Sequence, residues 1–118
     1  MPRRVLLVDD SAVTRTVTSE RLARRGLLVT TLSSSREVEQ VEPNAFAAAL
    51  LDLDLGDGFG PDVAARLRRA SPQIPIAFLT GGGGCPNVLD AARAIGPVFT
   101  KARGSEEAIG WVLAVVGL

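Results

Sequence analysis

Val5-Leu6-Leu7-Val8-Asp9-Asp10, near the amino terminus, consists of four apolar residues followed directly by two acids. A short apolar run of this kind is typical of a strand that is buried on both faces of a parallel sheet. Comparable runs recur along the chain, separated by segments with helical spacing or with glycine and proline. These runs predict five strands, over residues 5–8, 27–32, 45–51, 74–79 and 98–100.

Between the predicted strands, apolar residues recur at helical spacing, and residues that start or stop helices bracket the segments. By propensity alone, the alanines of residues 45–51 also suit a helix, so that alternative stays open there. Five strands alternating with five helices predict an α/β fold, a single domain whose parallel sheet carries helices on both faces. The predicted helices cover residues 11–25, 33–41, 61–70 and 86–95, and a last one begins at residues 105–107.

Charge and composition exclude several classes of protein. Thirteen acidic residues balance thirteen basic ones, so we expect neither nucleic acid nor a membrane as a direct partner. The longest apolar run, residues 45–51, is far shorter than a membrane span, which predicts a soluble, cytoplasmic protein. The chain has no histidine and a single cysteine, Cys85, which excludes histidine-based catalytic triads, the common zinc sites and an internal disulfide.

Polar side chains follow four of the predicted strands, namely Asp9-Asp10, Asp52, Thr80 and Lys101. The carboxyl ends of parallel strands meet at one edge of a sheet, so these side chains are expected to share one crevice. Two carboxylates about 4 Å apart repel by roughly 4 kcal/mol at an effective dielectric near 20. A raised pKa or a bound divalent cation must relieve this repulsion, and hard oxygen ligands favour Mg²⁺.

The chain resembles the receiver domains of two-component signalling, the family that includes the chemotaxis regulators. The resemblance covers the whole chain and implies a single (βα)5 flavodoxin-like domain, residues 1–118, with strand order 2-1-3-4-5. The motifs that carry it are Val-Leu-Leu-Val-Asp9-Asp10-Ser11, Leu-Leu-Asp52-Leu-Asp54-Leu-Gly-Asp-Gly-Phe-Gly60, Phe-Leu-Thr80-Gly81 and Val-Phe-Thr-Lys101.

The same resemblance implies a metal site. Asp52 is the expected phosphoacceptor and also contacts the ion. Asp10 is expected to ligate Mg²⁺ directly, Asp9 to act on it mainly through water, and Asp54 to offer its backbone carbonyl. By its chemistry, Asp52 would act as a carboxylate nucleophile while the ion offsets charge on the phosphoryl oxygens.

The expected phosphoryl-binding residues are Thr80, Gly81 and Lys101. The Thr80 hydroxyl can donate a hydrogen bond to one phosphoryl oxygen, and the Lys101 ammonium can contact another. Twelve of the thirteen basic residues are arginine, and the only lysine is Lys101. A compact ammonium suits a crowded phosphate site better than a planar guanidinium does.

The implied function is that of a phosphoacceptor, not of a classical enzyme, because its own chemistry is limited to self-catalysed phosphotransfer and autodephosphorylation. The implied phosphodonor is a histidine kinase or a histidine phosphotransfer protein. The sequence names neither the kinase nor the downstream protein target. Because no effector domain follows Leu118, we expect either a stand-alone receiver or a piece of a longer protein.

Two alternatives stay open. In the first, the chain is a pseudo-receiver that binds partners without phosphorylation, because it departs from the family pattern at Ala102 after the lysine, at residues 81–84 and at Val98 in the aromatic switch position. In the second, Asp52 and Asp54 form the Asp-x-Asp motif of haloacid-dehalogenase-like phosphatases. Steady turnover of a phosphate ester would distinguish that enzyme from a receiver, which takes up one phosphoryl group.

Overall fold

The computed structural model of the chain describes residues 3–82, 84–103 and 105–117. Its five strands form one parallel sheet in the order β2-β1-β3-β4-β5. The connection from β2 to β3 passes β1, so β3 lies at the centre of the sheet between β1 and β4, with β2 and β5 at the edges. The strands are β1 Arg4–Val8, β2 Leu28–Leu32, β3 Ala48–Asp52, β4 Ile76–Thr80 and β5 Val98–Thr100.

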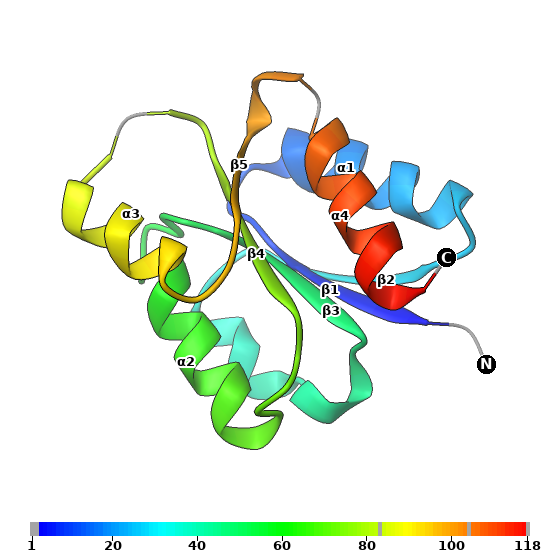
Figure 1. Cartoon of the computed structure of the whole chain (residues 1–118), viewed down its shortest axis with the longest axis horizontal. Helices are drawn as coiled ribbons and strands as arrows, with labels where there is room; N and C mark the ends of the chain where they lie inside the picture. The colour runs from blue at the N-terminus through cyan, green and yellow to red at the C-terminus, as the bar shows by residue number, and fades with distance from the viewer. Residues whose placement is uncertain (1–2, 83, 104, 118) are drawn as a thin grey trace.

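Helices cover both faces of this sheet. α1 and α4 lie together on one face, while α2 and α3 lie on the other (Figure 1). The two faces therefore have separate cores, one closed by α1 and α4 and the other by α2, α3 and the short helix after β2. The α-helices are α1 Ala12–Arg24, α2 Gly60–Ala70, α3 Pro86–Arg93 and α4 Glu106–Val116.

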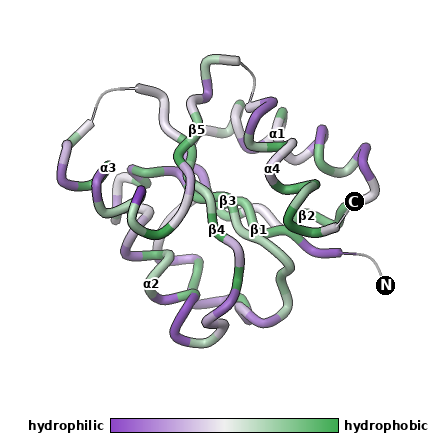
Figure 2. The backbone as a smooth tube through the Cα atoms, in the orientation of Figure 1, coloured by the Kyte–Doolittle hydropathy of each residue, from purple (hydrophilic) through white to green (hydrophobic). Residues whose placement is uncertain are grey.

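The central strands are largely apolar (Figure 2). All five residues of β3 are buried, and four of the five in β1 are buried as well. Neighbouring residues of these strands point to opposite faces, so that Leu6 and Leu51 pack in one core while Leu7 and Leu50 pack in the other. A continuous apolar run is what burial on both faces requires, which explains why these strands show no alternation.

The predicted fold class, strand order and five strands are confirmed, but the helix predicted over residues 33–41 is wrong. The segment is instead the 3₁₀ helix η1, Arg36–Gln40, stabilised by bonds such as Val38 N–H to Ser35 O. Only Val38 is buried within η1, so little apolar area would be gained by continuing it as an α-helix. A second 3₁₀ turn, η2 Pro43–Ala45, follows at once.

Smaller differences from the predictions concern the ends of elements. β3 begins three residues later than expected because η2 occupies the start of the predicted strand, and α3 ends at Arg93 instead of residue 95. After β5, the chain enters the 3₁₀ turn η3, Lys101–Arg103, through a trans bond between Lys101 and Ala102. Among the described residues, no helix combines the length and the apolarity that crossing a membrane requires.

Candidate functional site

The strand ends converge at the carboxyl edge of the sheet as predicted. Asp9 follows β1, Asp52 ends β3, Thr80 ends β4 and Lys101 follows β5. Asp9 is fully buried and Asp52 is 6% exposed, whereas the neighbouring Asp10 is exposed to solvent. The parallel sheet thus brings together side chains that are 92 residues apart in the sequence, as in the contact of Lys101 with Asp9.

Lys101 joins the two buried carboxylates. Its Nζ lies 3.1 Å from Oδ1 of Asp9 and 3.1 Å from Oδ2 of Asp52. Asp9 Oδ1 also accepts a hydrogen bond from the backbone N–H of Ser11, which caps α1. Asp52 Oδ1 accepts a bond from the backbone N–H of Asp54. One ammonium therefore offsets two negative charges in a confined space.

The acids and the lysine change each other's protonation. Burial, and then the negative charge of Asp9, raise the pKa of Asp52 to about 7, and Lys101 only partly opposes this rise. Burial by itself would lower the pKa of Lys101, but its hydrogen bonds and ion pairs with Asp9 and Asp52 outweigh burial and raise that pKa above its usual value. The site therefore retains a cation and holds Asp52 near its point of ionisation at neutral pH.

Asp9, Asp10 and Asp52 together can hold a metal ion. Each offers one carboxylate oxygen, and these oxygens all lie within 4.8 Å of one another. Asp9 Oδ2 is buried and has no hydrogen-bond partner among the described residues, although Lys101 Nζ lies 2.9 Å away outside hydrogen-bonding geometry. A set of hard carboxylate oxygens, one of them buried and without a hydrogen bond, fits a small divalent cation such as Mg²⁺.

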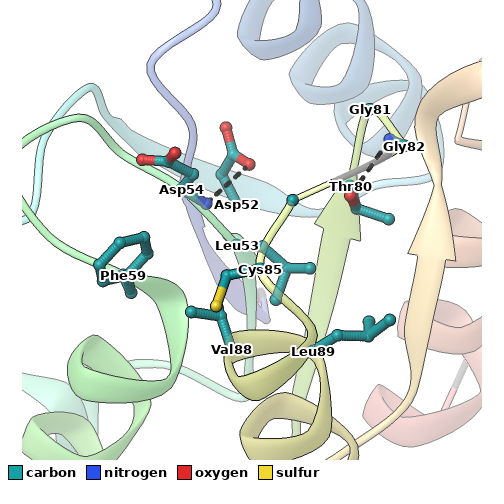
Figure 3. Close-up of a pocket in the computed structure, with 11 residues that line it drawn as sticks. Asp52, Leu53, Asp54, Phe59, Thr80, Gly81, Gly82, Cys85, Val88 and Leu89 are labelled. Atoms are coloured by element: carbon teal, nitrogen blue, oxygen red, sulfur yellow. Dashed lines mark hydrogen bonds between the residues drawn. The ribbon is translucent and has the colours of Figure 1, made fainter.

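Thr80 lies across a cavity from Asp52. The cavity has a volume of about 250 Å³, and Thr80, Gly81 and Gly82 line it together with Asp52 (Figure 3). The Thr80 Oγ1 accepts a hydrogen bond from the backbone N–H of Gly82, 3.2 Å away, which leaves its own hydroxyl proton available to donate. Thr80 and Gly81 thus lie where the sequence analysis expects them, beside the buried acid.

Asp54 takes a different position. Its side chain is exposed and points away from Asp52, and its Oδ1 accepts a hydrogen bond from the Gly56 N–H at 2.9 Å (Figure 3). The carboxylate is thus used inside its own loop, and only the backbone of Asp54 contacts Asp52. This placement agrees with a role for its backbone and not for its acid group.

Sequence reasoning missed the apolar wall of the cavity. Phe59, Val88 and Leu89 line it, next to the thiol of Cys85, which precedes the first residue of α3. These residues come from two segments and carry no motif of their own. Their shared location follows from the packing of α2 and α3 on the same face of the sheet, which the sequence does not display.

Comparisons with known proteins agree with this geometry. A model of the response regulator receiver domain matches residues 5–98. The response regulator protein TodT of Pseudomonas putida is 35% identical over 117 residues, which cover 96% of this chain. The chain spans about half of the length of TodT, since the match covers 50% of that protein.

Solved structures give the same picture. The non-phosphorylated HemR receiver domain of Leptospira biflexa superimposes with a TM-score of 0.83 and 29% identity, over 98% of this chain and 95% of that one. The BeF3-activated DrrB receiver domain superimposes with a TM-score of 0.85 over the full length of both chains. At 23% identity, the likeness to DrrB supports the fold alone.

Proposed function

The chain belongs to the response regulator receiver domain family, and from this we propose that Asp52 takes a phosphoryl group from a histidine kinase or a histidine phosphotransfer protein, with Mg²⁺. The observation that carries the proposal is the contact of Lys101 with both Asp9 and Asp52 beside Asp10. All described residues fold around one sheet, which supports one receiver domain over residues 1–118. The cytoplasmic location stays a prediction.

The proposed ligands of the ion are those that the family resemblance implies. Asp10, Asp52 and the backbone carbonyl of Asp54 would ligate Mg²⁺, and Asp9 would reach it through water. The charge of the ion would offset that of the phosphoryl oxygens. A nearby cation also favours the ionised form of Asp52, whose pKa of about 7 would otherwise leave part of it protonated.

In the proposed transfer, a carboxylate oxygen of Asp52 forms the new bond to phosphorus. The bond from phosphorus to the donor's imidazole nitrogen breaks at the same time, and the imidazole keeps the electron pair. Thr80 would donate its hydroxyl proton to one phosphoryl oxygen, and Gly81 would offer its backbone beside it. Lys101, already 3.1 Å from Asp52, would contact another oxygen. In autodephosphorylation, water would hydrolyse the bond between Asp52 and phosphorus at the same site.

A decisive experiment treats the protein with acetyl phosphate and Mg²⁺ and measures its intact mass. We expect one added phosphate in the wild type and in Asp62→Asn, a control that removes a carboxylate from the first turn of α2. We expect none in Asp52→Asn, and none when EDTA removes the ion. Undiminished modification of Asp52→Asn would contradict the proposal.

Phosphate release from an ester, measured beside the intact mass, addresses the two alternatives. A haloacid-dehalogenase-like phosphatase would release phosphate from an ester continuously, with Asp54 as its acid. The Asp54 carboxylate instead accepts a hydrogen bond from the Gly56 N–H within its own loop, which does not favour that role. A pseudo-receiver would show no modification in any variant, although its fold would be the same.

A further inference from the structure

The loop after the phosphoacceptor, residues 53–59, is tied to a distant segment of the chain. Both carboxylate oxygens of Asp57 accept hydrogen bonds from consecutive backbone amides, Oδ1 from Ser35 at 2.8 Å and Oδ2 from Arg36 at 3.0 Å. These amides open η1, 21 and 22 residues earlier in the sequence. Asp57 thus satisfies the first amides of a helix to which it does not belong. We call these two bonds the Asp57 clasp.

A third element meets the clasp at Ser35. Arg66 of α2 donates to the Ser35 backbone carbonyl at 2.9 Å and also to the Ser35 hydroxyl. On the other side of Ser35, a Cβ added at Gly58 would lie 2.8 Å from the hydroxyl oxygen, so the loop backbone packs directly against this residue. The loop, η1 and α2 are therefore joined at one point.

Two backbone bonds within the loop enclose Asp57, and one of them also encloses Asp54. Leu55 N–H donates to Gly58 O at 2.9 Å, and Gly60 N–H donates to Leu53 O at 2.8 Å. Leu53 and Leu55 are both buried, which anchors the loop on either side of Asp54. A chain held at both buried leucines and at Asp57 leaves the backbone of Asp54 little freedom to move.

The clasp bonds involve a charged acceptor. The backbone hydrogen bonds from Ser35 and Arg36 lower the pKa of Asp57, so its carboxylate is ionised at neutral pH. Hydrogen bonds to an ionised acceptor are stronger than those to a neutral one. Because Asp57 is exposed, however, these bonds contribute more to the orientation of the loop than to the stability of the fold.

We propose that Asp57 is a positioning residue for the metal site, and that the Asp57 clasp holds the loop so that the backbone of Asp54 is preset to ligate Mg²⁺. This inference rests on the proposed function. Mg²⁺ tolerates little departure from its preferred geometry, so a loop that must be ordered upon binding lowers the affinity. By linkage, binding of the ion must tighten the clasp to the same extent. η1 therefore reports on occupancy of the metal site.

The first test measures Mg²⁺ affinity by titration of backbone amide chemical shifts. Asp57→Asn keeps the shape of the side chain but places an N–H₂ group against one of the two amides. We expect the Mg²⁺ dissociation constant of Asp57→Asn to be at least threefold larger than that of Asp62→Asn. The Asp62→Asn variant removes the same charge from the first turn of α2. Equal constants in the two variants, with wild-type protein binding Mg²⁺ normally, would overturn the positioning role alone.

A charge-preserving variant separates geometry from electrostatics. Asp57→Glu keeps the negative charge but lengthens the side chain by one methylene, so it cannot meet both amides from the same backbone position. We expect it to weaken Mg²⁺ binding as Asp57→Asn does. If Asp57→Glu bound Mg²⁺ like the wild type while Asp57→Asn did not, charge and not the clasp would be responsible.

Hydrogen exchange gives the reciprocal test. Saturating Mg²⁺ should slow exchange of the Ser35 and Arg36 amides in the wild type by at least the factor by which Asp57→Asn weakens binding. Both amides should exchange faster in Asp57→Asn without metal. An unchanged rate at either amide on addition of Mg²⁺ to the wild type would contradict the coupling. If the wild type did not bind Mg²⁺ at Asp10 and Asp52 at all, the proposed function itself would fail at this step.

Discussion

Two loops border the cavity beside Asp52, and they are built in opposite ways. Residues 53–59 follow β3 with two buried leucines, internal backbone bonds and the Asp57 clasp. That loop contains two glycines among seven residues, whereas the loop after β4 is a run of glycines, of which Gly81, Gly82 and Gly84 are exposed. The predicted run extends over residues 81–84, of which Gly83 lies outside the described residues. Gly82 and Gly84 have φ of 96° and 97°, values that side chains other than glycine rarely adopt.

The two loops suit two different roles at one site, namely binding of the metal ion and movement of Thr80 toward a phosphoryl group. Ligation of a small cation is favoured by a backbone that is held in place before the ion arrives, and we propose that the loop after β3 has this role. Approaching a new phosphoryl oxygen requires Thr80 to move, and a loop of glycines allows this at little cost. We expect the same glycines to absorb the displacement through their own dihedrals and so to transmit little of it to α3.

The largest expected effect is on stability and comes from charge. The loop 53–59 directly follows the buried Asp52, whereas residues 81–85 carry no charge. The pKa of Asp52 is about 7 in the folded chain, against roughly 3.9 when unfolded. Between these values the unfolded chain has lost its proton while the folded chain keeps it, so rising pH favours unfolding. The resulting decrease in the free energy of unfolding grows up to pH 7 and reaches at most about 4 kcal/mol.

We therefore expect metal-free Asp52→Asn to be more stable than the wild type at pH 8, with a difference that shrinks toward pH 4. Urea denaturation of both proteins in EDTA at several pH values measures this difference. Groups remote from Asp52 cancel in the comparison, whereas Lys101, which is hydrogen-bonded to Asp52, contributes to the difference. Parallel stability curves across that range would show that Asp52 titrates normally.

The second prediction compares Gly60, the first residue of α2 directly after the loop 53–59, with Gly81 in the loop after β4. A Cβ at Gly60 would lie 2.5 Å from the Asp52 backbone carbonyl and 3.0 Å from Phe78, whereas a Cβ at Gly81 meets nothing within 4 Å. Gly60→Ala should lower the free energy of unfolding by about 1–3 kcal/mol. Gly81→Ala should change it by less than about 0.5 kcal/mol. Similar losses in the two variants, measured by chemical denaturation, would erase the contrast between the loops.

The third prediction tests transmission. Addition of beryllofluoride with Mg²⁺ should shift the amide signals of Gly81 and Gly82 strongly, and those of α3 and of Trp111 in α4 only modestly. Val98 contributes to this expectation because a small branched side chain has no ring to swing between inward and outward positions. Shifts across residues 88–93 as large as those in the glycine loop would show that the loop transmits the change after all.

The smallest expected effect belongs to the Asp54 side chain. Because its carboxylate is held by Gly56 within the loop 53–59, it should have little influence on water that attacks the phosphoryl group. The decay rate of phosphorylated Asp54→Ala should stay within about twofold of the wild type, or ~0.4 kcal/mol in the barrier. A change well beyond this, followed by intact mass over time, would mean that the side chain leaves Gly56 in the phosphorylated state.

Local patterns in the sequence account for the fold and for most of the candidate site. Apolar runs as long as a strand, separated by helical segments, determine an alternating α/β chain, and a parallel sheet places all its carboxyl ends on one edge. Asp9, Asp52, Thr80 and Lys101 could therefore be assigned to one crevice from their position after strands. The predicted bounds of the third strand, residues 45–51, were less accurate, since β3 is Ala48–Asp52. The alanines at its start suit a strand and a helical turn almost equally.

Tertiary structure alone decided what depends on partners far apart in the chain. Residues 33–41 have the composition of a helix start, but they form a 3₁₀ turn whose first amides are bonded to Asp57. Likewise, the pKa of Asp52 follows from its depth and from the nearby charges of Asp9 and Lys101. Burial and hydrogen bonds over long sequence separations are properties of the packed chain. A local pattern cannot contain them, because each depends on where another segment comes to lie.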